Sequence, residues 1–170
     1  MELVELAEVS RRDIAELIDG EPHPWGAGGE ALQWLEKDRH LALRTPEGRI
    51  VAMAGAAVVP VAVAGGEPFD VVGLGGLFIT HSQRGRGLMS MLVEPLLSLA
   101  REMGLERAML FCNAELVPVY ASAGFQEIEA PVWVDQPDGR VQMQMRAMWR
   151  ALRDGAAWPE GRVEVRALPF

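Results

Sequence analysis

The stretch QRGRGLMSML, residues 83–92, decides the fold of this chain, because it sets Gly85 and Gly87 directly before an apolar run. The segment before it, residues 69–82, has the composition of a strand. After it, apolar residues recur at helical spacing through residues 88–103. A helix start leaves backbone N–H groups unpaired and carries partial positive charge, and glycine lets the backbone approach an anion. The stretch therefore predicts a phosphate or pyrophosphate site.

The loop alone admits two other interpretations. Arg84 and Arg86 could form a basic nucleic-acid contact, or the segment could be a solvated turn. It does not contain the Walker pattern GxxxxGK[ST], and it does not complete GxGxxG, because Met89 and Ser90 follow. The net charge of −8 argues against nucleic acid, whose binding depends on neutralising phosphates with lysine and arginine. Residues 83–92 alone do not decide between a solvated turn and a phosphate site.

The composition indicates one soluble α/β domain over residues 1–170, with 49% hydrophobic and 24% charged residues. The single cysteine, Cys112, excludes an internal disulfide and a cysteine-based zinc cluster, and no metal site is expected. The N-terminal segment has no basic region like that of a signal peptide, and the longest apolar stretch is interrupted by Pro60. We expect a cytoplasmic protein with no membrane partner, and a homodimer is left open.

The hydrophobic pattern predicts the order of the elements. Ser10 and Asp13 form a capping signal for a helix that ends near Asp19, and a second short helix is expected over residues 30–38. A longer helix follows the glycine loop and ends at Gly104, with Pro95 expected to kink it. A short helix is expected over residues 114–124. Strands are expected at residues 1–8, as a pair within 40–63, at 69–82, 106–113 and 125–128, as a hairpin within 132–148, and once in the tail 158–170.

A second motif makes the glycine loop specific. Residues 112–125 read CNAELVPVYASAGF, and together with the loop they resemble the GCN5-related N-acetyltransferases. That family opens a helix with R/Q-x-x-G-x-G/A and later carries N-x-x-A-x-x-[LF]-Y-x-x-x-G-F. Arg84 and Gly87 match the first pattern, and Met89 departs from its final Gly or Ala. The second pattern is matched by Asn113, Tyr120, Gly124 and Phe125, while Leu116 and Val119 replace its Ala and its Leu or Phe.

The resemblance implies a fold and a co-substrate. The fold would be α/β, with a central mixed but mostly antiparallel sheet, one splayed pair of parallel strands and flanking helices. Acetyl-CoA would bind in the gap between the splayed strands, beside the strand that ends at Cys112. The expected cofactor-binding residues are Leu77, Phe78 and Ile79 for the pantetheine arm, Arg84, Gly85, Arg86, Gly87, Leu88, Met89 and Ser90 for the pyrophosphate, and Asn113.

Tyr120, the only tyrosine, is the expected general acid. At helical spacing beside valines it could be a core residue, but its distance from Gly124 and Phe125 matches the family motif. Acyl transfer from a thioester expels a thiolate, and a phenol with an ordinary pKa of about 10 can protonate it. Cys112 could instead carry an acyl group, but a buried strand cysteine is the better interpretation.

The general base is less clear from the sequence. Related acetyltransferases often place a glutamate on the strand before the loop, whereas this strand reads GLGGLFI. His81 follows the strand and could act as the base, and His23 is a similar candidate. Some relatives, notably the aminoglycoside and enhanced-intracellular-survival types, bring their own C-terminal carboxylate into the acceptor site. The resemblance therefore makes the carboxylate of Phe170 a third candidate, against the alternative that the tail only completes the sheet or a dimer contact.

The loop of residues 19–30 suggests the acceptor. It carries Asp19, Glu21 and Glu30, no lysine or arginine, and the aromatic Trp25. Asp19, Glu21 and Trp25 are therefore expected to border a pocket for a small, cationic primary amine, which would attack acetyl-CoA directly in a ternary complex. Because the strand lacks an acid, a non-catalytic acyl-CoA-binding or sensor module is the alternative function.

Overall fold

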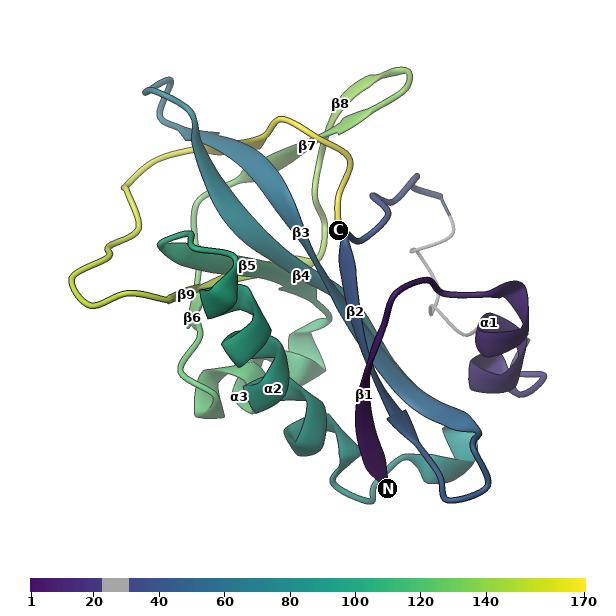
Figure 1. The fold of residues 1–170 in the computed structure, drawn as a ribbon. Helices are drawn as coiled ribbons and strands as arrows, with labels where there is room; N and C mark the ends of the chain where they lie inside the picture. The colour runs from purple at the N-terminus through teal and green to yellow at the C-terminus, as the bar shows by residue number, and fades with distance from the viewer. Residues whose placement is uncertain (23–30) are drawn as a thin grey trace.

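The computed structural model describes residues 1–22 and 31–170, and a twisted, curled β-sheet lies at its centre (Figure 1). In the described residues the sheet has ten strands. The strands are β1 (Glu2–Leu6), β2 (Arg39–Arg44), β3 (Ile50–Val63), β4 (Phe69–Ile79), β5 (Arg107–Cys112), β6 (Gln126–Glu127), β7 (Val132–Gln136), β8 (Gly139–Gln142), β9 (Arg146–Ala151) and β10 (Val163–Val165). The helices are α1 (Arg11–Ile18), α2 (Leu88–Glu102) and α3 (Val117–Ser122), with 3₁₀ turns η1 (His81–Gln83) and η2 (Ala114–Leu116).

The long strand β3 organises the sheet. One edge of β3 pairs with β4, and the other edge pairs first with β2 and then with β10. Beyond β4 the order continues β5, β9, β6, while β10 leads to the β7–β8 hairpin. Only the β4–β5 and β10–β7 contacts are parallel among the described strands. The expected mixed but mostly antiparallel sheet is thereby confirmed.

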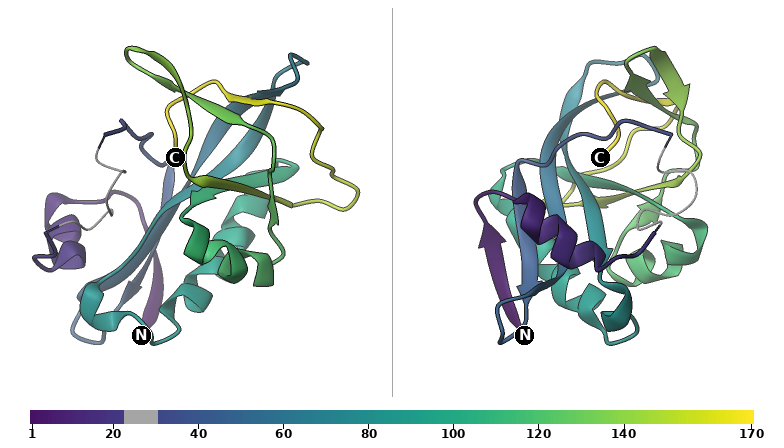
Figure 2. Two further views of the ribbon diagram at one scale, coloured as in Figure 1. Left: turned by 180° about the vertical axis from the view of Figure 1, so that it is seen from behind. Right: turned by 90° about the vertical axis from the view of Figure 1, so that its right-hand side faces the viewer.

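The two faces of the sheet carry different elements, as the two views in Figure 2 show. One face packs against α2, whose buried Leu92 and Leu96 join Leu74 and Leu110 of the sheet in one apolar cluster. The opposite face carries α1 and the C-terminal segment, and there Phe170 belongs to a second cluster. Each fully buried leucine contributes about 1.5–3 kcal/mol relative to exposure, so the apolar spacing of α2 fixes that helix to its face.

The capping signal predicted for the first helix is confirmed, whereas the expected strand end differs and no kink at Pro95 is shown. Ser10 and Asp13 form a complete capping box, since the Ser10 hydroxyl accepts from the Asp13 N–H at 3.1 Å and the Asp13 carboxylate accepts from the Ser10 N–H at 2.8 Å. The glycine-rich strand ends at Ile79 rather than Ser82, because His81–Gln83 forms the 3₁₀ turn η1. Pro95 lies inside α2, which runs without interruption from Leu88 to Glu102.

The helix expected over residues 30–38 is wrong. Residues 31–38 form no helix, although their apolar residues have helical spacing. Their backbone instead bonds to distant strands and to the tail. The Leu35 N–H donates to the Pro169 carbonyl at 2.7 Å, and the Asp38 N–H donates to the Ala56 carbonyl at 2.9 Å. Tertiary hydrogen bonds override a weak local propensity here, as they often do in short segments.

None of the helices in residues 1–22 and 31–170 is long and apolar enough to span a bilayer.

Candidate active site

The parallel strands β4 and β5 pair over only three register positions, from Val72↔Ala108 to Leu74↔Leu110. Beyond Leu74, within residues 31–170, β4 continues to Ile79 along β3 without pairing with β5. The β3–β4 register shifts near Gly55, and Gly76 has a φ of 60°, so β4 carries a bulge at the same level. The two strands therefore separate into the splayed opening that the family resemblance implied.

The glycine loop lies at the far end of this opening, between β4 and α2. Gly85 and Gly87 both adopt left-handed φ angles, 74° and 76°, and a Cβ at either position would meet no atom within 4 Å. Gly87 is the N-cap of α2, so the N–H groups of its first turn have no intrahelical acceptor. Leu88 is 5% exposed and anchors the helix start in the core. These residues fit a pyrophosphate group, because no side chain covers the outer side of the backbone at the two glycines and the N–H groups of the first turn of α2 have no intrahelical acceptor.

The Arg84 side chain folds back onto the protein. Its Nη1 and Nη2 atoms donate to the two carboxylate oxygens of Glu21 at 3.0 and 2.7 Å, and its Nε donates to the Ile79 carbonyl at 3.0 Å. Its guanidinium also lies 5.4 Å from the ring centre of Phe78. Arg84 therefore fixes the shape of the loop, and its charge is already shared with Glu21. The neighbouring Arg86 is exposed.

His81 lies beside Arg84, with 3.3 Å between its Nδ1 and the Arg84 Nη1. A guanidinium can only donate, so Nδ1 is the acceptor and the ring proton lies on Nε2. In this arrangement the basic nitrogen of His81 is already engaged. His23 and Trp25 lie outside the described residues.

Tyr120 projects from α3 into the face of the sheet that α2 covers. It is 8% exposed, and its ring meets that of Phe125 edge-on at 5.8 Å. Burial, and then the nearby Cys112, raise the pKa of the Tyr120 phenol well above its ordinary value, so the phenol keeps its proton. None of the described residues hydrogen-bonds to the Tyr120 hydroxyl. The hydroxyl is also absent from the fully buried polar atoms that lack a partner among these residues. Asn113 is exposed, and its carbonyl accepts from the Leu116 N–H at 3.0 Å.

Cys112 is 3% exposed beside Met148, and burial raises the pKa of its thiol to about 11. An acyl carrier needs a thiolate, so its surroundings favour the buried structural role.

The C-terminus docks on the opposite face of the sheet. Phe170 is 2% exposed, and its ring packs on Phe111 with the ring centres 4.9 Å apart. Cβ atoms built on Gly73 and Gly75 would overlap the Phe170 ring and its carboxyl carbon, respectively. The carboxyl group thus lies against β4 one residue beyond its last paired position, Leu74. Tyr120 and Phe170 therefore pack in clusters on opposite faces of the sheet.

Two residues that the sequence analysis did not single out lie on this face of the sheet, and one of them, Lys37, is beside the carboxyl group. Lys37 crosses the sheet over Gly55 and Gly75, and its Nζ donates to the Leu35 carbonyl at 2.8 Å. Burial lowers the pKa of Lys37 to about 8. His40 is paired with Gly55 in the register, and burial and then the Lys37 charge lower its pKa. One signal was available in the sequence, because Lys37 is the only lysine of the chain.

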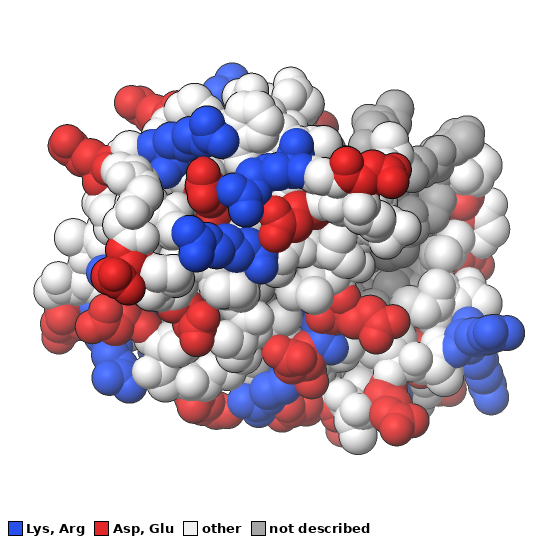
Figure 3. All heavy atoms as spheres, turned by 90° about the horizontal axis from the view of Figure 1, so that it is seen from above, with Lys and Arg blue, Asp and Glu red and all other residues white. Residues whose placement is uncertain are grey.

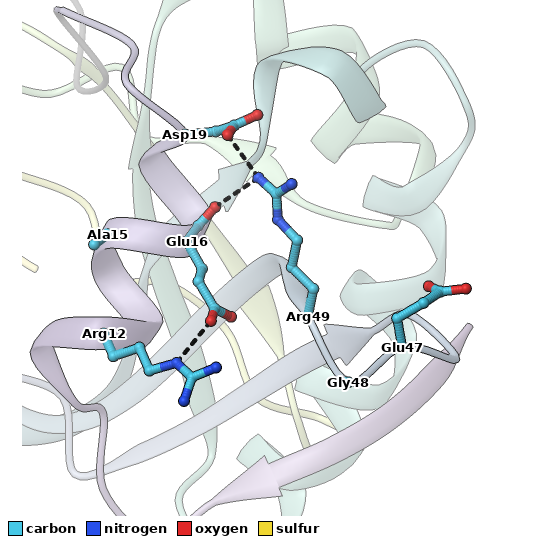
Figure 4. A pocket seen from close by; sticks show the side chains of 7 residues that line it. All are labelled: Arg12, Ala15, Glu16, Asp19, Glu47, Gly48 and Arg49. Atoms are coloured by element: carbon cyan, nitrogen blue, oxygen red, sulfur yellow. Dashed lines mark hydrogen bonds and ion pairs between the residues drawn. The ribbon is translucent and has the colours of Figure 1, made fainter.

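The acidic side chains expected at the acceptor pocket are largely neutralised. Glu21 is held by Arg84, as described above. Asp19 pairs with Arg49 at 2.8 Å in a surface hollow between α1 and the β2–β3 turn. Figure 4 shows Arg49 reaching both Asp19 and the Glu16 carbonyl there. These carboxylates tie elements together, which leaves less free negative charge than the sequence alone suggests.

The surface charge is mixed. On the face seen in Figure 3, acidic and basic side chains are interleaved. That face therefore lacks the continuous positive surface that contacts with a phosphate backbone require. Within residues 1–22 and 31–170, no group of three or more His, Cys, Asp or Glu side chains could hold a metal ion.

Comparison with known proteins identifies the arrangement. A family model described as the acetyltransferase (GNAT) family matches residues 10–125. No curated protein matches the chain. Similar solved structures are the N-acetyltransferase YhbS from Escherichia coli in complex with CoA (18% identity, 96% of this chain and 89% of that one, TM-score 0.61), ElaA from Escherichia coli (18%, 88% and 98%, 0.58) and a GNAT acetyltransferase from Staphylococcus aureus (16%, 89% and 100%, 0.54). These likenesses show the fold. The match of the family model over more than half of the sequence shows that the chain belongs to the acetyltransferase (GNAT) family, whose members use acyl-CoA as co-substrate.

Proposed function

We propose that this protein is a single-domain N-acetyltransferase that moves an acetyl group from acetyl-CoA to the primary amine of a small, cationic acceptor. One observation supports the proposal: the helix start at Gly87 follows the part of β4 that does not pair with β5, and Tyr120 is buried in the cluster on the α2 face, near Cys112 at the end of β5. Transfer is by direct attack of the amine in a ternary complex, and a cytoplasmic location stays a prediction.

Different residues of this chain bind the co-substrate and donate the proton in the proposed reaction. The first-turn amides of α2, with those of residues 85–87, hold the pyrophosphate, and the edge of β4 at residues 77–79 that faces away from β3 pairs with the pantetheine arm. The Arg84 N–H, which the sequence analysis included in this set, instead donates to the His81 carbonyl at 3.2 Å. Acetyl-CoA supplies the activated thioester. Tyr120 donates its proton to the departing sulfur, and the raised pKa of its phenol keeps that proton available at neutral pH.

The proton of the attacking amine needs an acceptor on the opposite face. The carboxylate of Phe170 is the better candidate, because it lies against Gly75 at the start of the opening. His81 ranks below it, because its Nδ1 already accepts from Arg84. Asp19, Glu21 and Trp25 stay predictions for the acceptor pocket, and the ion pairs of the two acids predict only a modest preference for cations.

A screen of primary amines and aminoglycosides, read by thiol release from acetyl-CoA, tests the proposal. The buried Cys112 keeps the protein's own thiol out of this readout. Turnover with an amine and a covalently acetylated product is the expected result. The alternative, a non-catalytic acyl-CoA-binding module, is favoured by the absence of an acid along β4 from Val71 to Ile79. Tight CoA binding in calorimetry, without turnover on any amine, would establish that alternative.

A further inference from the structure

The only lysine of the chain lies on the face of the sheet opposite α2. Gly55 on β3 and Gly75 on β4 are register partners, so neither strand contributes a side chain to the face at this level. Lys37 fills the space: a Cβ on Gly55 would lie 2.6 Å from its Cγ, and a Cβ on Gly75 would lie 3.1 Å from its Cε. The side chain therefore crosses β3 and brings its amine to β4.

The end of this side chain lies where β4 separates from β5. Within residues 31–170, Leu74 is the last residue of β4 that pairs with β5, and Gly75 is the next along the strand. In the proposed arrangement the pyrophosphate is held after β4, at residues 85–87, and the pantetheine arm runs back along residues 77–79. The acyl end of the arm then points toward Gly75. Neighbouring strands lie about 4.8 Å apart, so an acyl group beside Gly75 would be about one strand spacing from the residue that Lys37 covers.

The surroundings of the amine favour its neutral, nucleophilic form. Burial lowers the pKa of Lys37 to about 8, so about half of it is neutral at pH 8. Within residues 1–22 and 31–170, no Asp or Glu side chain makes an ion pair with it. Its Nζ donates to the Leu35 carbonyl at 2.8 Å, and a neutral amine keeps its lone pair while it donates. Desolvated lysines of this kind serve as nucleophiles toward carbonyl carbon.

An acylated lysine suits the same place. Acylation turns the amine into a neutral amide, which costs less to bury than an ammonium group. The amide keeps one N–H, so the bond to the Leu35 carbonyl can persist. The Leu35 N–H in turn donates to the Pro169 carbonyl at 2.7 Å, which holds the segment around the lysine on the sheet.

We propose that Lys37 is a site of self-acetylation, at which the lysine amine accepts the acetyl group of acetyl-CoA bound in the β4–β5 opening. This reaction rests on the proposed function, which places acetyl-CoA there. The lone pair of Nζ attacks the thioester carbonyl carbon, the C–N bond forms and the C–S bond breaks. The sulfur leaves as a thiolate and takes the proton of Tyr120, while the new amide nitrogen gives one proton to solvent and solvent restores the phenol. The products are Nε-acetyllysine and CoA.

Mass spectrometry tests the proposal with acetyl-CoA as the only reagent. Because Lys37 is the only lysine, its amine and the N-terminal amine are the only two primary amines of the 170-residue chain, and peptide mapping separates them. The N-terminal amine measures spontaneous acetylation. We expect one acetyl group on Lys37, added at least about tenfold faster than at the N-terminus, because the bound donor is held beside the lysine.

Three controls separate transfer within the site from reaction with acetyl-CoA in solution. Transfer from bound acetyl-CoA should saturate as its concentration rises, and excess CoA should suppress it. Gly87→Ala, at the helix start, should slow acetylation of Lys37 but not of the N-terminus, whereas Gly48→Ala, in a distant turn with a similar φ, should change neither rate. Lys37→Arg keeps a cation but not the nucleophilic amine, so it should gain no acetyl group beyond the one at the N-terminus.

Acetylation of Lys37 that is no faster than at the N-terminus, or that rises without saturation, would overturn the proposal. Calorimetry of CoA binding separates this result from a failure of the proposed function. If CoA binds and Lys37 stays unmodified, self-acetylation is excluded, and the proposed function depends on the amine screen alone. If Lys37 is acetylated but no amine is turned over, self-acetylation holds and the proposed small acceptor is wrong. If CoA does not bind, both proposals fail.

Discussion

Arg84 and Glu21 join the glycine loop to the segment after α1 through two parallel hydrogen bonds of 3.0 and 2.7 Å. Their side chains are 43% and 19% exposed, so the ion pair contributes less than about 1 kcal/mol to stability. Its two-point geometry nevertheless fixes one orientation of the guanidinium. We therefore interpret the ion pair as a contact that holds the loop in one conformation rather than as a major source of stability.

Glu21→Gln should loosen the glycine loop. The neutral amide cannot accept two charge-assisted bonds, so hydrogen exchange across residues 81–87 should become faster, with a loss of stability below about 1 kcal/mol. Asp19→Asn is the matched control, because it removes an ion pair to Arg49 on the same segment without touching the loop. If both variants change hydrogen exchange in the loop equally, the Arg84–Glu21 pair does not hold the loop in place.

Gly87→Ala should weaken binding of CoA. The new methyl group meets no protein atom, but it covers the outer side of the helix start and forces alanine into a φ of 76°. Gly48→Ala provides the control, since Gly48 has a φ of 87° with equally open space and lies in the β2–β3 turn. Both variants should lose about 1–2 kcal/mol of stability from backbone strain. Only Gly87→Ala should lower CoA affinity in calorimetry, and unchanged affinity would argue against the anion site.

Tyr120→Phe should lower turnover by about 10²–10⁴-fold with little change in CoA affinity, because only the proton donor is lost. The ring contact with Phe125 is kept, so the melting temperature should hold. Phe125→Leu is the complementary variant, since it disturbs the packing and retains the hydroxyl. It should melt earlier yet keep most of its turnover. A fully active Tyr120→Phe protein would return the tyrosine to a packing role.

Cys112 should be unreactive in the folded protein. Its pKa of about 11 leaves almost no thiolate at pH 8, and its side chain is buried, so Ellman's reagent should label it only after unfolding. The raised pKa also predicts the pH dependence of stability. Between the ordinary value of 9.0 and about 11, the unfolded thiol loses its proton first, so the free energy of unfolding falls as pH rises. Urea titrations at pH 8.5 and 10.5 should show a smaller decrease for Cys112→Ala than for the native chain.

The local parts of the fold could be predicted from the sequence. The capping box of α1, the glycine loop and α2 each depend on residues within a few positions of one another, and their patterns are strong. The cofactor side of the site follows from the same short stretches, because a helix start creates its own donors.

The acceptor side could not be predicted, because it depends on contacts between distant segments. The apolar spacing in residues 31–38 suggests a helix until Pro169 and Ala56 supply backbone partners. Nothing near Lys37 in the sequence indicates that two glycines on other strands leave space for its side chain. The same holds for Arg84, whose charge suggested a phosphate contact but whose partner, Glu21, is 63 positions away.

Because β4 and β5 pair over only three register positions, the end of β4 forms a strand edge inside the sheet. Residues 75–79 extend for roughly 16 Å at the usual rise per residue, with no neighbouring strand from β5. A strand edge that lacks its neighbouring strand is a template for strand addition by other chains. Under the proposed function, an extended ligand with its own amide groups acts as the missing strand. Protein stripped of CoA should therefore self-associate more readily on warming, and saturating CoA should suppress this while raising the melting temperature by mass action.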